Sequence, residues 1–334
     1  MPRLKGLFVL RPDAYDAIYG PAQRAAIAEQ VDMVAPPQTK ESVSRHPEML
    51  RDVEVLFSGW GAPLVDAALL AHAPRLRAIF YGSGSIKGFV TDAVWERGIL
   101  VTSAQAINAI PVAEYTLAAI LFSLKHVWPL VEQARREQRF PTRDHVPGVY
   151  GATIGIIGLG LTGRLLRERL YPFGVRVIAY DPYVSSAEAA ELDVAMCPLE
   201  TLFCDAQVVS LHAPLLPETV GMVNGTHLAS MPSGATFINT ARGGLVRQEE
   251  MIAVLTQRRD LYAVLDVTEP EPPPPGSALY SLPNVTLTPH IAGSLGSERR
   301  RMGQTMVEEL QRFVAGQPLL YAITREQVQN MATP

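Results

Sequence analysis

Three segments of the sequence place an arginine, a carboxylate and a histidine directly after short apolar runs. Arg242 follows the run that ends at Asn239, several acidic residues follow Leu265, and His290 follows Leu287. Such runs are typical of buried parallel strands, and open α/β sheets bind ligands at the carboxyl ends of their strands. The sequence therefore predicts one crevice that contains an anion-binding arginine, a carboxylate and a proton-exchanging histidine.

A glycine-rich turn follows the apolar run Thr153–Ile157 and opens a helical pattern. Gly158 permits a tight turn, Gly160 lets a pyrophosphate approach the backbone, and Gly163 lets helix and strand pack closely. The helix N-terminus then presents free N–H groups to the phosphates. Asp181 ends the next apolar run at about the expected spacing of 20 residues, where it can accept both ribose hydroxyls of adenosine. Its charge repels a 2′-phosphate, so the motif predicts NAD rather than NADP.

Short apolar runs alternate with helical patterns along most of the chain, and we interpret the runs as strands. Before the glycine turn the predicted strands are Leu4–Leu10, Val53–Phe57, Leu76–Phe80 and Leu100–Thr102. After it they are Thr153–Ile157, Val175–Tyr180, Val208–Leu211, Ala235–Asn239, Leu261–Leu265 and Val285–Leu287. The predicted helices are Pro63–Ala71, Pro111–Lys125 with Pro111 in its first turn, Arg164–Leu170 and Ser297–Ala315. This βαβ rhythm predicts an α/β fold with a doubly wound sheet.

Composition and charge indicate which kinds of partner to expect and in which cellular compartment the protein is found. The formal net charge is −4 and no basic block is present, so nucleic acid is not expected as a partner. We interpret the short cluster Arg299–Arg301 as the solvated face of a helix. The two cysteines, Cys197 and Cys204, fit a reducing cytoplasm. The apolar stretch Val112–Leu124 carries Glu114 and is interpreted as too short to span a bilayer, so we expect a cytoplasmic protein without a membrane partner.

Further motifs indicate a family. The glycine motif occurs together with Asn108–Glu114, Val209–Leu215 and the three strand-end segments. With these motifs the chain resembles the D-isomer-specific 2-hydroxyacid dehydrogenases, best between residues 103 and 293. The resemblance implies an NAD-dependent oxidoreductase that moves a hydride between NAD(H) and C2 of a small D-2-hydroxy or 2-oxo acid.

The resemblance also implies a catalytic triad. Arg242 binds the substrate carboxylate and the 2-oxygen, and His290 exchanges the hydroxyl proton as the hydride moves. Glu271 hydrogen-bonds the imidazole, fixes its tautomer and favours its protonated form. Glu269 is the neighbouring alternative for this carboxylate.

The supporting residues come from the same resemblance. Substrate binding is assigned to the backbone N–H groups of Ser83 and Gly84, to Asn108 and to Trp60. Asn108 is read equally well as a helix cap before Pro111, and Trp60 as a packed aromatic. Cofactor binding is assigned to Gly158, Gly160, Leu161, Thr162, Gly163, Asp181, Ala213, Pro214, Thr240, Ala241, Asp266 and Gly293. No metal site is predicted.

The chain departs from the family pattern at several places. Leu161 and Thr162 stand where the family usually has arginine and isoleucine, which removes a phosphate contact. Ile86 replaces an aspartate after the early glycine turn, and Arg247 replaces an acidic residue. The segment Phe57–Gly61 lacks the basic residues of phosphoglycerate-using relatives, which favours a non-phosphorylated substrate. We also expect no regulatory domain of the kind that some phosphoglycerate dehydrogenases carry.

The fold that the resemblance implies is discontinuous. A Rossmann NAD-binding domain, residues 105–292, is inserted into a smaller flavodoxin-like substrate domain formed by residues 1–104 and 293–334. The helix Pro111–Lys125 and the following arm Trp128–Phe140 are expected to form a homodimer contact. The alternative function is an NAD-binding regulatory protein with little turnover on the same fold, because C-terminal-binding corepressors resemble these enzymes and use NAD to control assembly.

Overall fold

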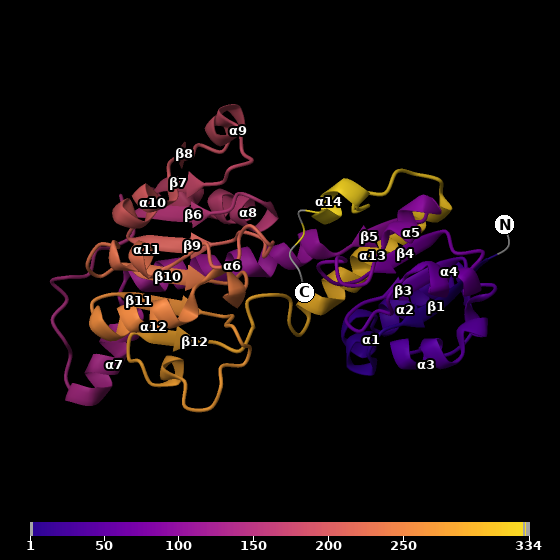
Figure 1. Cartoon of the computed structure of the whole chain (residues 1–334), viewed down its shortest axis with the longest axis horizontal. Helices are drawn as coiled ribbons and strands as arrows, with labels where there is room; N and C mark the ends of the chain where they lie inside the picture. The colour runs from indigo at the N-terminus through magenta and orange to yellow at the C-terminus, as the bar shows by residue number, and fades with distance from the viewer. Residues whose placement is uncertain (1–2, 330, 332–334) are drawn as a thin grey trace. The chain divides into compact units, whose positions relative to one another are not determined.

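The chain divides into two compact units (Figure 1). The computed structural model describes residues 3–329 and 331 of the 334-residue chain. Unit 1 combines Met1–Asn108 with Ser294–Pro334, and unit 2 is the continuous stretch Ala109–Gly293. The domain limits expected from the sequence, residues 105 and 292, lie within a few residues of these ends.

Unit 1 is built on a parallel five-stranded sheet with the order β2-β1-β3-β4-β5. Its strands are β1 (Leu4–Val9), β2 (Val31–Met33), β3 (Val55–Ser58), β4 (Ala78–Tyr81) and β5 (Leu100–Ser103). Every residue of β3 and β4 is buried, as expected for parallel strands covered on both faces. The order is that of flavodoxin-like sheets, which confirms the predicted fold class for this unit.

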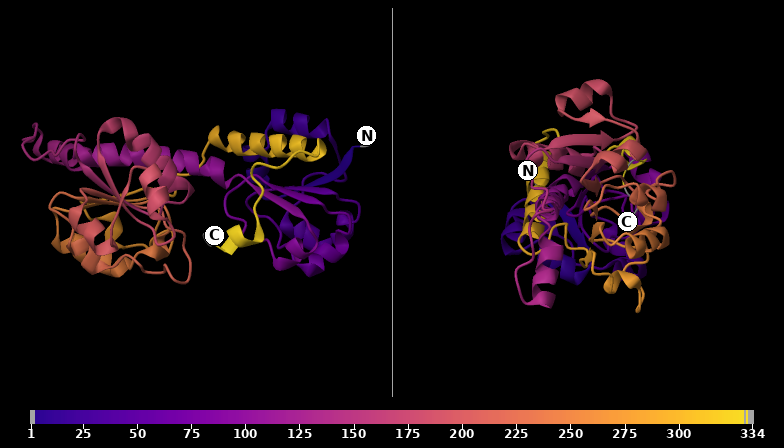
Figure 2. Two further views of the ribbon diagram at one scale, coloured as in Figure 1. Left: turned by 90° about the horizontal axis from the view of Figure 1, so that it is seen from above. Right: turned by 90° about the vertical axis from the view of Figure 1, so that its left-hand side faces the viewer.

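Helices cover both faces of the unit 1 sheet (Figure 2). They are α1 (Pro12–Ile18), α2 (Pro21–Ala28), α3 (Lys40–Arg45), η1 (Pro47–Leu50), α4 (Ala67–His72), α5 (Asp92–Glu96), α13 (Glu298–Val314) and α14 (Arg325–Gln329). On one face, Phe57 and Phe80 stack with ring centroids 5.3 Å apart beneath Met302 and Met306 of α13. The C-terminal segment is therefore part of the core of unit 1.

One predicted helix of unit 1 begins later than expected. The prediction placed a helix at Pro63–Ala71, whereas α4 begins at Ala67. The Asp66 carboxylate accepts a hydrogen bond of 2.9 Å from the backbone N–H of Leu69 and caps the helix there. The side chain of Asp66 thus fixes the first turn, since an N-cap residue satisfies backbone N–H groups that have no partner within the helix.

A buried carboxylate fastens the chain after α13. Glu309 is 1% exposed, and its two oxygens accept hydrogen bonds of 3.1 and 3.0 Å from the backbone N–H groups of Leu320 and Tyr321. The carbonyl of Tyr321 then accepts from the N–H of Ser103 at the end of β5. These bonds tie the residues that follow α13 to the edge of the unit 1 sheet.

Unit 2 contains a parallel seven-stranded sheet with the order β12-β11-β10-β9-β6-β7-β8. Its strands are β6 (Thr153–Ile157), β7 (Arg176–Tyr180), β8 (Ala195–Met196), β9 (Val208–Leu211), β10 (Thr236–Asn239), β11 (Tyr262–Leu265) and β12 (Val285–Leu287). The chain order reverses between β6 and β9, which is the switch point of a Rossmann sheet. The predicted doubly wound Rossmann fold is therefore confirmed for this unit.

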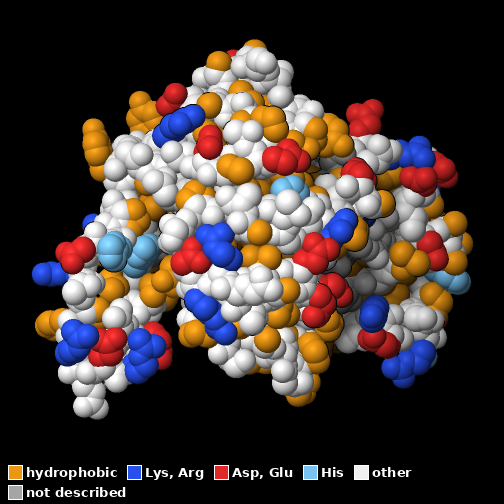
Figure 3. Space-filling model, turned by 60° about the vertical axis from the view of Figure 1, so that its left-hand side comes forward, with side chains coloured by type: hydrophobic (Ala, Val, Ile, Leu, Met, Phe, Trp, Pro, Cys, Tyr) orange, Lys and Arg blue, Asp and Glu red, His pale blue; other side chains and the backbone are white. Residues whose placement is uncertain are grey.

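Helices and short 3-10 turns connect the strands of unit 2. They are α6 (Gln105–Leu124, which begins in unit 1), α7 (Val127–Glu137), α8 (Leu161–Leu170), η2 (Tyr171–Phe173), α9 (Ser186–Glu191), α10 (Leu199–Asp205), α11 (Gly225–Ala229), η3 (Gly243–Leu245), α12 (Gln248–Gln257) and η4 (Ala278–Tyr280). On the face shown in Figure 3, Lys and Arg side chains alternate with Asp and Glu rather than forming a continuous basic surface.

The long helix α6 corrects two expectations from the sequence. It begins at Gln105, so Pro111 lies inside it and not in its first turn. The hydroxyl of Ser103 accepts a hydrogen bond of 3.1 Å from the N–H of Gln105, so a side chain starts the helix well before the proline. The prediction that Asn108 caps a helix at Pro111 is therefore wrong.

The length of α6 also bears on the membrane prediction. At twenty residues it is, within the described part of the chain, the one helix long and apolar enough to cross a bilayer, so shortness does not exclude a span. Its buried residues include Ala113 and Ile120, which pack in the core of unit 2 with Ile154 of β6. The apolar character of α6 is explained by this packing against the sheet.

Candidate active site

The glycine turn lies at the switch point of the unit 2 sheet. Gly158 follows β6 with φ +92°, a conformation that side chains disfavour, and a Cβ there would come within 2.7 Å of the backbone nitrogen of Ala213 after β9. A Cβ at Gly163 would collide with the carbonyl of Gly158. At Gly160 a Cβ would meet nothing within 4 Å, so the backbone there is open to a ligand. The three glycines thus meet the requirements of a pyrophosphate-binding turn.

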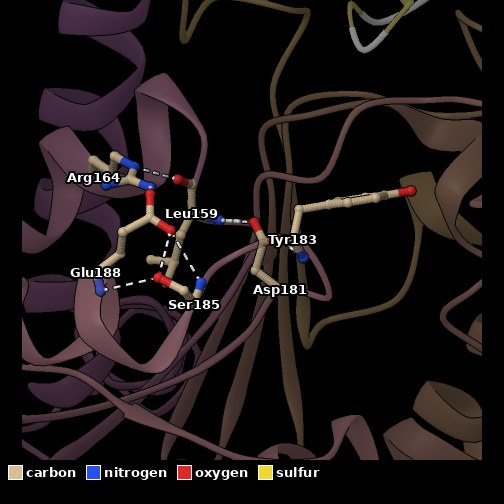
Figure 4. A network of polar contacts seen from close by, with 6 residues as sticks. All are labelled: Leu159, Arg164, Asp181, Tyr183, Ser185 and Glu188. Atoms are coloured by element: carbon tan, nitrogen blue, oxygen red, sulfur yellow. Dashed lines mark hydrogen bonds and ion pairs between the residues drawn. The ribbon is translucent and has the colours of Figure 1, made fainter.

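Both backbone polar groups of Leu159 in this turn, its N–H and its carbonyl, form hydrogen bonds with side chains (Figure 4). Its N–H donates to one oxygen of Asp181 at 2.7 Å, and its carbonyl accepts from the guanidinium of Arg164 at 2.8 Å. The other oxygen of Asp181 accepts from the backbone N–H of Tyr183 at 2.9 Å. The predicted ribose-binding carboxylate therefore lies next to the glycine turn and has a fixed orientation.

Arg164 and Glu188 are members of this network that sequence reasoning missed. The two side chains pair at 3.1 Å (Figure 4). Glu188 also accepts from the N–H and hydroxyl of Ser185, which completes the capping box of α9. The signal that could have located them is the spacing of Ser185 and Glu188, since a serine followed three residues later by glutamate marks a helix start.

The remaining predicted residues around the glycine turn differ in exposure. Leu161 is the first residue of α8 and is 47% exposed, whereas Thr162 is half-buried. The apolar side chain of Leu161 cannot hydrogen-bond a phosphate, so the backbone N–H groups of the helix start must supply such bonds. Ala213 is buried against Gly158, and Pro214 follows it in the same segment.

His212, which precedes Ala213, has a structural role. Its Nε2 lies 2.8 Å from the hydroxyl of Ser210, and its backbone N–H donates to the carbonyl of Ile157. Desolvation lowers the pKa of His212 to about 4, so the ring is neutral at physiological pH. The backbone of His212 thus links the end of β9 to β6, and its neutral ring, which already bonds the hydroxyl of Ser210, does not act as an acid.

Arg242 lies in the turn that follows β10. Asn239 holds this turn, because its amide nitrogen donates to the carbonyl of Arg242 at 3.0 Å and its amide oxygen accepts from the N–H of Ala241. The guanidinium donates to the carbonyl of Ala241 at 2.8 Å. Burial lowers the pKa of Arg242, while the charge of Glu271 raises it. Arg242 and Glu271 therefore act on each other electrostatically within unit 2.

His290 and Glu271 form the predicted pair. The Nδ1 atom of His290 lies 2.7 Å from an oxygen of Glu271, and both side chains are roughly half exposed. His290 has φ +54°, a left-handed backbone conformation that is strained for a residue with a side chain. Since Nδ1 faces the carboxylate, Nε2 is the nitrogen that can exchange a proton with a ligand.

Asp266 holds the segment that carries His290. Its carboxylate is 2% exposed and accepts hydrogen bonds from the hydroxyl of Thr288 at 2.6 Å and from the N–H groups of Ile291 and Ala292 at 2.8 Å each. The backbone carbonyl of Asp266 accepts from the N–H of His290. Sequence reasoning gave Asp266 a place beside the nicotinamide, and these bonds make it the residue that positions His290.

Two further predicted cofactor residues surround this segment. Thr240 is buried after β10, and its hydroxyl lies 3.2 Å from that of Thr116 in α6. Ala241 packs at the edge of the unit 2 core. Gly293, the last residue of unit 2, is half-buried beside the held segment.

The predicted substrate residues lie in unit 1 at the carboxyl ends of its strands. Ser83 and Gly84 follow β4, and the hydroxyl of Ser103 donates to both of their carbonyls, at 3.1 and 2.5 Å. Asn108 accepts a hydrogen bond of 2.9 Å from the N–H of Ser294. Trp60 follows β3 and is partly buried. Ile86, which replaces the family's aspartate, is fully buried in the core. An apolar contact thus fills the place that the family gives to a carboxylate.

The fold and the site together define a dinucleotide-binding α/β protein whose Rossmann unit carries a histidine–carboxylate pair and an arginine. Residues 117–292 match the family described as D-isomer specific 2-hydroxyacid dehydrogenase, NAD binding domain. The chain belongs to the D-isomer specific 2-hydroxyacid dehydrogenase family, as the sequence predicted, and the matched part is that family's NAD-binding domain.

Individual relatives agree with this membership. The chain is 34% identical over 301 residues to D-3-phosphoglycerate dehydrogenase of Mycobacterium tuberculosis, covering 89% of this chain and 56% of that protein. It is 32% identical over 290 residues to glyoxylate reductase of Korarchaeum cryptofilum, covering 85% of each. It shares its fold with the NAD-complexed D-isomer specific 2-hydroxyacid dehydrogenase of Lactobacillus delbrueckii (TM-score 0.77, 21% identity, 96% and 100% covered). The chain thus spans about half the length of the phosphoglycerate dehydrogenases it matches.

Proposed function

We propose that this protein transfers a hydride between NAD(H) and C2 of a small 2-hydroxy or 2-oxo acid of D configuration. The observation that carries the proposal is the 2.7 Å pair of His290 and Glu271, together with the half-buried Arg242, whose pKa the charge of Glu271 raises. NAD supplies the hydride acceptor in one direction and the donor in the other. Support for NAD comes from Asp181 beside the glycine turn and from the NAD-binding domain that residues 117–292 match.

Each residue of the triad has a distinct task in this proposal. Glu271 holds the Nδ1–H tautomer of His290, so Nε2 accepts the hydroxyl proton during oxidation and returns it to the 2-oxygen during reduction. Arg242 binds the substrate carboxylate and the 2-oxygen through its planar fork. Reduction thus consumes one hydride from NADH and one proton from His290, and yields the 2-hydroxy acid and NAD.

Unit 1 supplies substrate recognition in the proposal. The backbone N–H groups of Ser83 and Gly84 bind the substrate carboxylate, and Trp60 bounds the substrate chain. The segment 57–61 carries no basic side chain, which favours a non-phosphorylated acid even though several relatives are named for phosphoglycerate. Cys197 and Cys204 are free thiols, which fits a cytoplasmic location.

We also propose a homodimer that involves α7. No residue of α7 is buried, and Val131 on α7 and Phe122 near the end of α6 are more than 40% exposed. Such exposed apolar side chains on an unpacked helix are typical of a surface that another chain covers. Sedimentation of the wild-type protein and of a Val131→Glu variant tests this, since the variant is expected to sediment as a monomer.

The activity is tested by following NADH absorbance with a panel of 2-oxo acids. His290→Ala is expected to lower kcat about 1000-fold, within the range for loss of a general acid. Its affinity for NADH, measured by fluorescence titration, is expected to match the wild type. If wild-type protein binds NADH but reduces no 2-oxo acid, the proposed reaction is wrong and an NAD-binding regulatory role becomes the better explanation.

A further inference from the structure

An arginine of unit 1 stacks on the predicted pocket tryptophan. Arg299 lies in the first turn of α13, and its guanidinium carbon is 5.1 Å from the centroid of the Trp60 ring. Its Nε donates to the carbonyl of Ser294 at 3.2 Å. An arginine over an aromatic face is attracted by the ring electrons and held flat. The expectation that Arg299 belongs to a merely solvated helix face is therefore wrong.

The terminal nitrogens of Arg299 have no partner in the described part of the chain. Neither hydrogen-bonds a described residue, and no described carboxylate lies within 4.0 Å of the guanidinium. One neighbouring cation is occupied: Arg11, whose N–H donates to the carbonyl of Trp60, pairs with Asp13 at 3.0 Å. Lys87 donates to the carbonyls of two C-terminal residues. Arg299 is thus a held cation whose outer donors are available to a ligand.

Arg299 lies at the sheet edge where the proposed substrate loops are found. Trp60 follows β3, and Ser83 and Gly84 follow β4, so all three stand at the carboxyl ends of neighbouring parallel strands. Ser294, which accepts from Arg299, donates to Asn108 just after β5. This edge of a doubly wound sheet is where such folds bind ligands.

We propose that Arg299, held flat on Trp60, binds a second carboxylate at the far end of the substrate, so that the substrates are 2-oxo and 2-hydroxy dicarboxylic acids. The inference rests on the proposed function, because it extends the substrate that Ser83 and Gly84 bind by its first carboxylate. The two outer nitrogens of a guanidinium match the two oxygens of a planar carboxylate. The face of Trp60 beside them suits the methylene groups between the two carboxylates.

A single guanidinium also explains why the second group is a carboxylate and not a phosphate. A phosphate monoester carries close to two negative charges at neutral pH, whereas the guanidinium of Arg299 carries one positive charge. The segment 57–61 adds no basic side chain. The single positive charge of Arg299 matches the single negative charge of a carboxylate.

The test compares 2-oxo acids that differ by the second carboxylate. With NADH, kcat/KM is measured for oxaloacetate and 2-oxoglutarate, and for 2-oxobutanoate and 2-oxopentanoate. Wild-type protein is expected to prefer the dicarboxylates. Arg299→Met is expected to lower their kcat/KM roughly 10- to 100-fold, mainly through KM, since a hydrogen-bonded charge contributes about 1.5–3 kcal/mol. The monocarboxylates should be affected far less.

Two further variants separate recognition from damage to the fold. Arg299→Lys keeps the charge without the planar fork and is expected to retain part of the preference. Arg301→Met removes an exposed arginine of the same helix and should behave as wild type. Equal losses on both substrate classes in Arg299→Met, or a wild-type preference for monocarboxylates, would overturn the inference and leave the proposed function intact.

The remaining outcomes are equally decisive. If phosphohydroxypyruvate is the best substrate and depends on Arg299, the far group is a phosphate and the assignment to a carboxylate is wrong. If no 2-oxo acid is reduced although NADH binds, the proposed function fails and this inference fails with it.

Discussion

The two units differ in how many of the polar groups at their strand ends form hydrogen bonds within the protein. In unit 2, Asp266 accepts three hydrogen bonds through its carboxylate, and His290 is already paired with Glu271. In unit 1, Gly84 borders open space and the outer nitrogens of Arg299 bond no described residue. Groups that move a proton gain from being fixed before the ligand arrives, whereas groups that recognise a ligand must keep donors available for it. Substitutions around His290 in unit 2 should therefore act mainly on kcat, and those around Ser83 and Gly84 in unit 1 mainly on KM.

The largest expected effect comes from substituting Asp266, because its carboxylate holds the segment that carries His290. Asp266→Asn replaces one carboxylate oxygen by an NH₂ group, which faces either the Thr288 hydroxyl and the N–H of Ile291, or the N–H of Ala292. We expect the free energy of unfolding to fall by about 3 kcal/mol, because a buried donor loses its charged partner. Urea denaturation measures this loss, and steady-state kinetics on the folded protein should show kcat reduced at least tenfold.

Asp260→Asn is the matched control for that substitution. The Asp260 carboxylate also accepts hydrogen bonds in unit 2, from the guanidinium of Arg258, but it lies at the opposite end of the sheet, before β11. It should cost stability without changing kcat. If Asp266→Asn leaves kcat at the wild-type value, Asp266 does not position His290.

A second prediction concerns the stability of unit 2 at acid pH. The folded pKa of His212 is about 4, whereas an unfolded histidine titrates near 6.5, so the unfolded chain binds more protons below pH 6.5. Stability is therefore unaffected by His212 above pH 6.5 and falls as the pH drops toward 4, by about 3 kcal/mol in total. Urea unfolding at a series of pH values measures this slope.

His212→Asn should flatten that slope. The variant removes the titrating ring and keeps a group that can bond the hydroxyl of Ser210. His72→Asn, in α4 of unit 1, serves as the control, because its side chain is exposed. An unchanged slope in His212→Asn would mean that another group controls the acid sensitivity.

The smallest expected effect comes from a substitution in unit 1, which tests whether this unit acts mainly on substrate binding. Ser103→Ala removes the hydroxyl that donates to the carbonyls of Ser83 and Gly84. We expect KM for the 2-oxo acid to rise about three- to tenfold, since a neutral hydrogen bond contributes about 1 kcal/mol, while kcat changes less. Ser123→Ala, which removes a buried hydroxyl that bonds only its own helix, should leave KM unchanged. A fall in kcat without a change in KM would contradict the assignment of substrate recognition to unit 1.

Much of this arrangement was accessible from the sequence. The glycine turn, Asp181 and the three strand-end segments were found because chemistry at the carboxyl ends of parallel strands leaves local motifs behind each apolar run. The start of α6 was missed because proline suggested a first turn, whereas the hydroxyl of Ser103 starts the helix six residues earlier. A hydrogen bond between a side chain and a backbone N–H two residues later thus overrode the signal from proline.

Arg299 shows a different limit. Its contact with Trp60 joins residues from opposite ends of the sequence, and nothing in either local segment indicates the pairing. A run of three arginines is usually a solvated helix face, and only the packing of α13 against the first half of unit 1 gives one of them a different role. Local patterns therefore revealed the residues of unit 2 more fully than those of unit 1.

The construction of unit 1 from both ends of the chain has a consequence for biosynthesis. The strands that carry Phe57 and Phe80 leave the ribosome early, but Met302 and Met306, which cover these rings, are made only after all of unit 2. During translation an aromatic sheet face is therefore left in water while a whole Rossmann unit folds behind it. Domains otherwise tend to fold in order from the N-terminus, and uncovered apolar surface promotes aggregation. The nascent chain thus passes through a stage at which the first half of unit 1 exposes an apolar surface to which chaperones would bind.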